Sequence, residues 1–348
     1  MQVDLNSQKE IELENCTFAK TVLMLLIVLY HSILYYAGNW FVGTPSEISK
    51  PLSLLSSYFN SFHIYAFVFI SGYIFYYLKC ERDKYTKFGP FIANKAKRLL
   101  VPYVFVSLLW VIPIGLLFYE WDFWTVFKNY ALAMRPSQLW FLIMLFGVFV
   151  IAWPLTKIFK ERNILGVFIA LCFWGVSVVG AKYIPNVFGV WTTCAYVVFF
   201  YLGFKTRQYS NLNVKRIPFY VWIVLHALLF VISELISGND NTLVKLAGIL
   251  LTLMLHLTGA IMAFTTLVWL GSRIRWEHSK VFDVFSKNSM VIYLLHQQVI
   301  YFSIFLLNGL INPYLNAAIN LAVSLLVSTL LSILLMRFKV TRFMVGEK

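Results

Sequence analysis

The fold is decided by residues 17–37, which read TFAKTVLMLLIVLYHSILYYA. At a rise of 1.5 Å per residue, a helix of this length crosses a hydrocarbon core of ~30 Å. Nine further stretches of similar character follow, and their apolar residues are continuous rather than alternating, which argues against the strands of a membrane barrel. The sequence therefore predicts an all-α, polytopic membrane protein with about ten transmembrane helices. The expected spans are 17–37, 58–78, 99–118, 138–155, 164–181, 187–204, 217–237, 245–270, 284–306 and 314–336.

The composition excludes a water-soluble globule. Of the 348 residues, 60% are hydrophobic and 13% are charged, whereas a soluble domain carries about 25% charged residues. The polar segments between the spans are too short to fold alone, so residues 1–348 are expected to form a single membrane-embedded domain without an extracytoplasmic soluble domain. The cysteines are scattered, so no metal site is expected. They are Cys16, Cys80, Cys172 and Cys194.

The distribution of basic residues orients the chain. The net charge is +14, which would suggest nucleic acid in a soluble protein. The two termini and every second loop hold 24 of the 29 Lys and Arg residues, and the alternate loops hold five. Short basic loops stay on the cytoplasmic side of a membrane. Both termini are therefore expected to be cytoplasmic, and no nucleic-acid partner is expected.

Five of the six histidines fall inside the expected spans: His31, His63, His226, His256 and His296. Counted from the cytoplasmic ends, His31, His63 and His256 lie roughly 21–22 Å up, His296 about 18 Å and His226 about 13 Å. Ionisable residues at such depths are costly and are candidates for function. Four histidines are expected to share one layer in the outer half of the membrane. The alternative is that each only bonds a neighbouring helix.

Lys20 and His31 belong to the same expected helix. Eleven residues separate them, which is three turns plus about 20°, so they lie on one face about 16 Å apart. A cation near the cytoplasmic end and an imidazole deep in the membrane would hold a long anionic ligand at two points. The alternative is a lysine that reaches lipid phosphate.

Five stretches of the sequence carry short patterns of polar and aromatic residues. The first, LENCTFAKTVLMLLIVLYHSILYY (13–36), has a basic residue, ten residues and a histidine. The second, FNSFHIYAFVFISGYIFYYL (59–78), has Phe-His followed by Ser-Gly-Tyr. The others are FIANKAKRLLVPYVF (91–105), QLWFLIMLF (138–146) and NSMVIYLLHQQVI (288–300). In this order the five stretches resemble the acyltransferase-3 family of bacterial membrane acyltransferases, and the sequence departs from it where Lys20 replaces the usual Arg, and where Ile64 and Tyr65 replace Met-Pro.

The resemblance implies an acyl-CoA-dependent O-acyltransferase in the bacterial cytoplasmic membrane. Such an enzyme passes an acetyl or other short acyl group to a hydroxyl of a surface polysaccharide or of a lipid-linked precursor, with acetyl-CoA the simplest co-substrate. His31 is then the candidate general base, with a transient acyl carrier as the alternative, because an imidazole titrates near working pH. His63 would orient the acceptor or polarise the thioester, and His296 is the third catalytic candidate.

The densest basic cluster, Lys95, Lys97 and Arg98, is expected to open the third helix on the cytoplasmic side. With Lys20, it is assigned to the phosphates of CoA, helped by the free amides of that helix N-terminus. The alternative is simple positive-inside topology or contact with anionic lipid.

The expected acceptor site is aromatic. The outer loop LLFYEWDFWTVFKNY (116–130) places Trp121 and Trp124 beside carboxylates, a combination suited to sugar rings. An interfacial aromatic belt with a short amphipathic helix is the stronger alternative. Residues of the family-like stretches complete the set of candidate substrate contacts: Tyr73, Trp140 and Tyr293.

Two other functions fit parts of the sequence. A secondary transporter or flippase of a lipid-linked sugar would also have ten helices and central histidines, although Glu234 is the clearest carboxylate for proton coupling and lies near a helix end. A non-catalytic subunit of a polysaccharide export complex is the third alternative. The expected partners are the lipid bilayer, a glycan or lipid-linked glycan acceptor and, as one option, a second copy of the chain in a homodimer.

Overall fold

The structure is a computed structural model that describes residues 2–38, 40, 43–210 and 217–347, with the side chains of residues 2–14 outside the description. Over these residues the chain is helical and holds no β-strand. Ten of its helical segments are long and apolar enough to cross a membrane, which confirms the predicted all-α, multi-pass architecture. They are Asn15–Ala37, Lys50–Glu81, Phe88–Phe118, Ser137–Glu161, Asn163–Tyr183, Val187–Gln208, Phe219–Ile236, Thr242–Gly271, Lys280–Leu307 and Pro313–Leu335.

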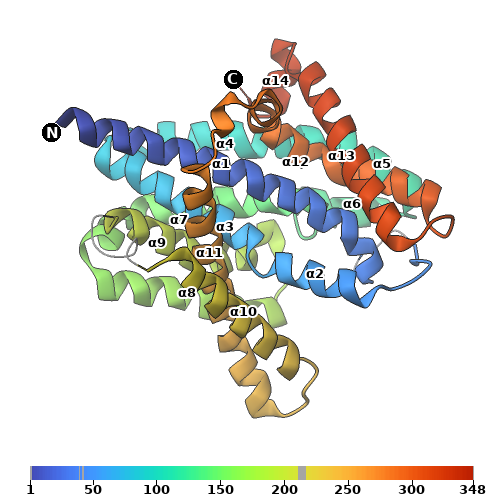
Figure 1. The fold of residues 1–348 in the computed structure, drawn as a ribbon, viewed down its shortest axis with the longest axis horizontal. Helices are drawn as coiled ribbons and strands as arrows, with labels where there is room; N and C mark the ends of the chain where they lie inside the picture. Colours follow the sequence, from blue (N-terminus) through green and yellow to red (C-terminus); the bar gives the residue numbers. More distant parts are fainter. Residues whose placement is uncertain (1, 39, 41–42, 211–216, 348) are drawn as a thin grey trace.

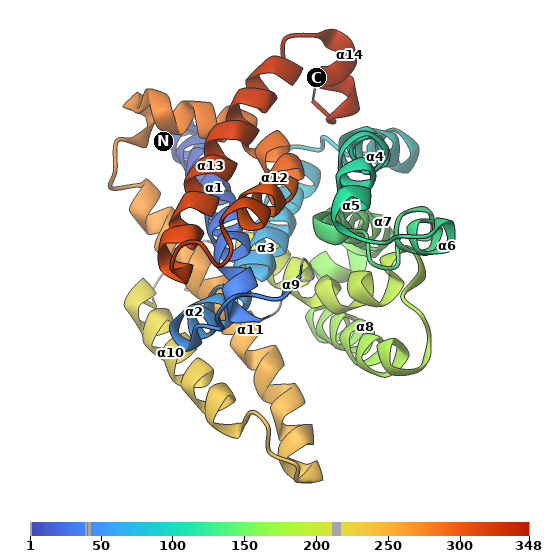
Figure 2. The same ribbon diagram turned by 90° about the vertical axis from the view of Figure 1, so that its right-hand side faces the viewer.

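The centre of the bundle is formed by α1 (Gln2–Leu34), α3 (His63–Tyr76) and α12 (Lys280–Leu307), as Figure 2 shows. α1 packs against α3, α12, α11 (Thr242–Gly271) and α13 (Pro313–Leu335). Every side chain of α12 from 291 to 301 is buried, including its polar ones. A helix surrounded by protein in this way can carry polar residues that lipid would not tolerate.

A second group of helices lies beside α3 (Figure 2). α9 (Val190–Gln208) packs on α3, α7 (Trp140–Glu161) and α8 (Asn163–Tyr183) pack against α9, and α4 (Phe88–Val106) packs against α7. The α3–α9 crossing is glycine-dependent. A Cβ atom at Gly72 would collide with the carbonyl oxygen of Phe200, and one at Gly203 with that of Phe69. Small residues let membrane helices approach this closely.

The helices α10 (Phe219–Ile236) and α11 form a hairpin whose tip extends away from the rest of the bundle (Figures 1 and 2). Large apolar side chains on both helices are exposed from the protein, for example Leu228 at 56% and Leu250 at 59%. Exposed apolar surface of this kind suits contact with lipid, which is as apolar as the side chains themselves.

Two predicted helix ends were wrong in ways that matter for the site. The second span does not begin at residue 58. α2 (Lys50–Asn60) comes first, the helix is interrupted at Ser61 and Phe62, and α3 starts at His63. The third span begins at Phe88 rather than at 99. Residues 94–98, which lie outside the expected span, form exposed and half-buried turns of a continuous helix.

Candidate active site

Two histidines from distant parts of the sequence meet at the centre of the bundle. The Nε2 atom of His296 on α12 lies 3.1 Å from Nδ1 of His31 on α1. The two imidazole centroids are 4.9 Å apart. His296 is fully buried and His31 is half-buried. The structure therefore brings together two of the three predicted catalytic residues.

The third histidine, His63, stands at the break between α2 and α3. Its Nδ1 hydrogen bonds the carbonyl oxygen of Phe59, in the last turn of α2. Carbonyls of a last turn have no partner in their own helix, and this one accepts from the backbone N–H of Phe62 at 3.2 Å as well as from the imidazole. The His63 ring lies 4.9 Å from the ring of Tyr30, the neighbour of His31, and within electrostatic range of His31 itself. All three predicted catalytic histidines thus lie in one cluster.

The hydrogen bonds assign the protons of the three neutral rings. Each Nδ1 faces a backbone carbonyl oxygen three or four residues earlier: Ile27 for His31 at 3.0 Å, Tyr293 for His296 at 2.7 Å, and Phe59 for His63. A carbonyl oxygen only accepts, so each Nδ1 carries the hydrogen and each Nε2 carries the lone pair. The one Nδ1–H of His31 is then shared between the Ile27 carbonyl oxygen and the Nε2 lone pair of His296. Among the described residues, no hydrogen bond reaches Nε2 of His31 or of His63.

The other intramembrane histidines lie apart from this cluster. His226 on α10 bonds the hydroxyl of Ser61 at 3.0 Å and the carbonyl oxygen of Leu255 at 3.2 Å. His256 on α11 stacks on Tyr65, with ring centroids 3.9 Å apart. The predicted layer of four histidines is therefore three clustered rings with His256 on a separate aromatic contact. For His226 the alternative expectation, a bond to a neighbouring helix, describes what the structure shows.

The basic residues converge from α1 and α4. Lys20, Lys95 and Arg98 lie within electrostatic range of one another. The ammonium group of Lys95 stands 3.8 Å from the centroid of the Phe149 ring. Arg98 is 57% exposed and lies 3.9 Å from the carboxylate of Glu347. Lys97 is exposed.

The expected help from helix amides is absent at this cluster. α4 starts at Phe88, so its free amides lie two turns before Lys95 and Arg98. The prediction that the cluster opens the helix was therefore wrong. The expected span, 99–118, covers only the apolar run, whereas α4 also includes the polar segment before residue 99.

The predicted substrate contacts fall into separate places. Tyr293 is buried one turn from His296, its ring 5.8 Å away, and its hydroxyl donates to the Gln138 carbonyl oxygen. Trp140 lies at the start of α7 against Tyr196, 5.8 Å between ring centroids. Tyr73 is ten residues along α3 from His63, about 15 Å. Its hydroxyl instead accepts from Arg207 Nη1 at 3.2 Å.

The two loop tryptophans differ in direction. Trp121 is half-buried and stacks on Tyr119 with centroids 4.9 Å apart. Trp124 is 61% exposed on α6 (Phe123–Val126), next to Phe123. Asp122 caps this helix, and its hydrogen bonds to Thr125 lower the pKa of its carboxyl. The short helix agrees with the interfacial alternative for Trp124, whereas Trp121 faces the protein.

Several polar residues around the histidines were missed from the sequence. Gln138 donates to the carbonyl oxygen of Leu294 at 2.9 Å and to Gln298 at 2.7 Å. Gln297 donates to Ser137 at 3.0 Å and to Tyr301 at 2.7 Å. The adjacent Gln297 and Gln298 inside an expected span were the sequence signal for this polar network, because buried amides in a membrane must find protein partners.

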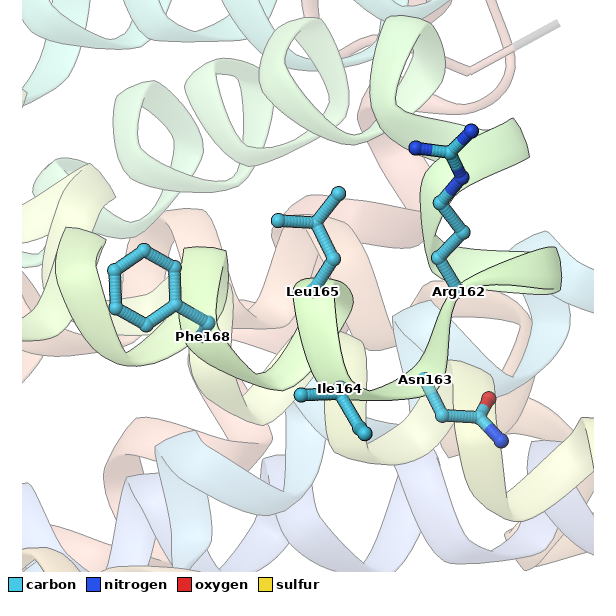
Figure 3. Close-up of a pocket in the computed structure, with 5 residues that line it drawn as sticks. All are labelled: Arg162, Asn163, Ile164, Leu165 and Phe168. Atoms are coloured by element: carbon cyan, nitrogen blue, oxygen red, sulfur yellow. The ribbon is translucent and has the colours of Figure 1, made fainter.

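A surface depression of about 650 Å³ lies at the turn between α7 and α8, away from the helices that carry the histidines (Figure 3). The Arg162 and Phe168 side chains extend from its two ends (Figure 3). Its shape is open and its apolar side chains are exposed, including Ile164 at 88%. It is lined by Arg162, Asn163, Ile164, Leu165 and Phe168.

Comparison with known proteins agrees with the family resemblance. No curated protein and no solved structure gives a significant match to the chain. Residues 15–337 match the acyltransferase-3 family, whose conserved unit is described as an acyltransferase domain. This match spans all ten candidate membrane helices and includes every clustered histidine and basic residue. The chain therefore belongs to the acyltransferase-3 family and is a multi-pass membrane acyltransferase.

Proposed function

We propose that the enzyme transfers an acetyl or other short acyl group from acyl-CoA to a hydroxyl of a surface glycan or of its lipid-linked precursor. The observation that carries the proposal is the His31–His296 contact of 3.1 Å, at the far end of the helix that also bears Lys20. A base and a cationic anchor on one rigid helix suit a substrate that has a reactive end and a polyanionic end.

In this reaction Nε2 of His31 takes the proton of the acceptor hydroxyl while the hydroxyl oxygen attacks the thioester carbonyl. The carbon–oxygen bond forms, the carbon–sulfur bond breaks, and the proton passes from His31 to the sulfur, so CoA leaves as a thiol. Imidazole serves as both acid and base near neutral pH. His296 is a positioning residue, because its Nε2 accepts from Nδ1–H of His31 and holds the ring. His63 offers a second lone pair, which orients the acceptor hydroxyl.

The basic cluster supports CoA as the donor. Lys20, Lys95 and Arg98 come from two helices and lie close enough to repel one another. A polyanion placed among them relieves that repulsion, and CoA carries phosphates at the end opposite its thiol. Lys20 and His31 are about 16 Å apart along α1, a length that an extended pantetheine arm can bridge. Lys97, exposed one residue before Arg98, adds positive charge at the entrance.

Use of cytosolic CoA also implies an orientation. The basic end of α1 then faces the cytoplasm, as the positive-inside distribution predicts, and both termini lie inside the bacterial cytoplasmic membrane. The acyl group reaches His31 from the basic end, and the acceptor approaches from the opposite end, where Trp121 stacks on Tyr119 in the connection between α5 (Ile112–Phe118) and α6. In the proposal Trp140 and Tyr293 line the acceptor path. Tyr73 does not, because its hydroxyl accepts a hydrogen bond from Arg207.

The test is acyl transfer by purified protein in lipid nanodiscs, with acetyl-CoA and a lipid-linked glycan. Free CoA is followed with a thiol reagent, and the glycan is analysed by mass spectrometry. His31→Ala is expected to lower the rate by about 10³-fold, within the usual range for loss of a general base. His226→Phe is the matched control, because His226 is also a buried intramembrane histidine but lies outside the cluster. Equal rates for His31→Ala and wild type would exclude His31 as the base.

The transporter alternative gains nothing from the structure. Glu234, its candidate for proton coupling, is exposed in the last turn of α10. Flux of a lipid-linked sugar in liposomes without CoA would nevertheless favour it over transfer.

A further inference from the structure

Acyl transfer needs a hydrogen-bond donor that the three histidines do not supply. When a hydroxyl attacks a thioester, negative charge develops on the carbonyl oxygen, and donors fixed around it are usually the largest catalytic contribution. Here the N–H groups of His31, His63 and His296 all face backbone carbonyl oxygens three or four residues earlier in the chain. Their free nitrogens carry lone pairs, which would repel an oxyanion.

Trp40 has the missing donor. Its indole ring lies against His31, with centroids 5.6 Å apart and planes at 85°. Its other side meets Tyr301 at 5.5 Å. The residue is 9% exposed, and its Nε1–H is buried without a hydrogen-bond partner among the described residues. Such an unsatisfied buried donor costs about 1–3 kcal/mol, and orphaned donors in native proteins call for an explanation.

We propose that the Trp40 indole N–H donates to the thioester oxygen as it becomes an oxyanion, which makes Trp40 a further catalytic residue. This inference rests on the proposed acyl-CoA transfer. Tyr301 does not satisfy the donor in the structure: its hydroxyl accepts from Gln297 at 2.7 Å, and no hydrogen bond joins it to the Trp40 indole. Among the described residues the N–H therefore has no acceptor, and in the proposal the substrate supplies one.

In the proposal each of the three side chains has a separate role. His31 accepts the hydroxyl proton through Nε2, His296 holds the Nδ1 side of the same ring, and Trp40 covers the ring from a third direction. Base and oxyanion donor must lie on either side of the reacting carbonyl carbon, within a few ångströms of each other. The His31 and Trp40 ring centroids are 5.6 Å apart, so the base and the indole lie within that range of each other.

The experiment compares two changes at Trp40 in the nanodisc transfer assay. Trp40→Phe removes the N–H and one ring. Site-specific benzothienylalanine at position 40 keeps the bicyclic shape and replaces only the N–H by sulfur. Both are expected to lower kcat by about 10²-fold, the effect of losing one oxyanion donor, while the KM for acetyl-CoA changes little. A KM-against-kcat split of this kind separates transition-state stabilisation from binding.

Trp222→Phe is the matched control. The Trp222 indole N–H is also buried without a partner among the described residues, but it lies on α10, outside the histidine cluster. Its substitution is expected to leave kcat within about twofold. Tyr30→Phe tests the other hydroxyl donor near the cluster, next to His63.

The results separate this inference from the proposed function. If benzothienylalanine retains wild-type kcat, or if Trp222→Phe loses as much as Trp40→Phe, the N–H of Trp40 has no catalytic role. A loss in Tyr30→Phe alone would assign the oxyanion to Tyr30 and overturn the inference. If His31→Ala is inactive while both Trp40 variants are active, only this inference fails. If His31→Ala matches wild type, the proposed function fails and this inference fails with it.

Discussion

α12 and α10 are both apolar enough to cross a membrane, and α10 is the more apolar of the two, yet their surroundings are opposite. In α12, 72% of the membrane-crossing window is buried inside the protein, and in α10 only 11% is. Lipid solvates apolar side chains as well as protein does, so hydrophobicity does not draw a helix inward. Polar residues do. α12 carries His296, Gln297 and Gln298, whereas α10 presents Leu and Val to its outside.

The difference teaches where to look for the site. The interior of the bundle is marked by its less apolar helices, because buried polar groups need protein partners. The α10–α11 hairpin needs few such partners, and within the described part of the chain the hydrogen bond from α10 to the break before α3 comes from His226. Substitutions matched between the central helices and the hairpin test this contrast directly.

The largest stability effect is expected at the Glu81–Arg207 ion pair, which joins α9 to the helical end of the second span. Arg207 is 2% exposed, and its Nε and Nη2 atoms lie 2.7 and 3.0 Å from the two carboxylate oxygens. Glu81→Gln leaves the buried guanidinium without its counter-charge and should lower the free energy of unfolding by about 4 kcal/mol. Unfolding in mixed micelles measures the loss.

The hairpin supplies the control for that pair. Asp240 and Lys245 form an ion pair at 3.0 Å, but their side chains are 99% and 60% exposed. Asp240→Asn should change the unfolding free energy by under about 0.5 kcal/mol. Comparable losses for the two variants would contradict the contrast between centre and hairpin.

The next effect concerns the close crossing of α3 and α9. Gly72→Ala places a methyl group on the carbonyl oxygen of Phe200, which is backbone and cannot turn aside. The helices must separate, at about 3 kcal/mol, the upper end for overpacking. Gly248→Ala in the hairpin meets only the tip of Ile236, 3.8 Å away. Its better helix propensity should leave stability unchanged or raise it by up to about 1 kcal/mol. Thermal unfolding of both variants decides the point.

Matched leucines give a smaller difference. Leu294 on α12 is fully buried, and Leu228 on α10 is 56% exposed. Leu294→Ala leaves a cavity, but its hydrophobic transfer cost is reduced because the surrounding solvent is lipid, so we expect about 2 kcal/mol rather than the larger values of soluble cores. Leu228→Ala should cost almost nothing, because lipid fills the space. A similar loss at both positions would show that the hairpin is covered by protein in the membrane.

The sequence alone predicted the spans, the shared face of Lys20 and His31, and the candidates among the histidines. These follow from span length and helical period, which are local properties. It could not place His63 at a helix break, because no local pattern in the sequence marks residues 60–62 as the end of one helix and the start of the next. It also could not find Trp40, which lies outside the spans and acquires its meaning only from contact with His31.

The depth of a residue in the membrane can be estimated from its position along a helix. The partner of a buried histidine also depends on how that helix is rotated and on which helix it meets, and neither follows from the sequence. His226 and His296 are both intramembrane histidines, and the sequence set them apart only by estimated depth and by the family-like stretch that holds His296. In the structure, one lies between α10 and the α2–α3 break, and the other pairs with His31.

The smallest expected effect separates these two kinds of histidine. His226→Phe removes the hydrogen bonds to Ser61 and to the Leu255 carbonyl oxygen. Neither partner is left without a bond, because the Ser61 hydroxyl has the Tyr58 carbonyl oxygen as an acceptor 2.6 Å away and the carbonyl of Leu255 lies within α11. Membrane hydrogen bonds of this kind contribute about 0.6 kcal/mol each, so the expected loss of unfolding free energy is about 1 kcal/mol.

The same variant should keep its rate of CoA release within about twofold, since His226 touches none of the three clustered histidines. His296→Phe should differ in its rate, which we expect to fall by about 10²-fold, while its stability loss is of similar size to that of His226→Phe. If both variants lost activity equally, the hairpin would have to be coupled to the histidine cluster. The Ser61–His226 bond, two residues from His63, is the contact through which that coupling would run.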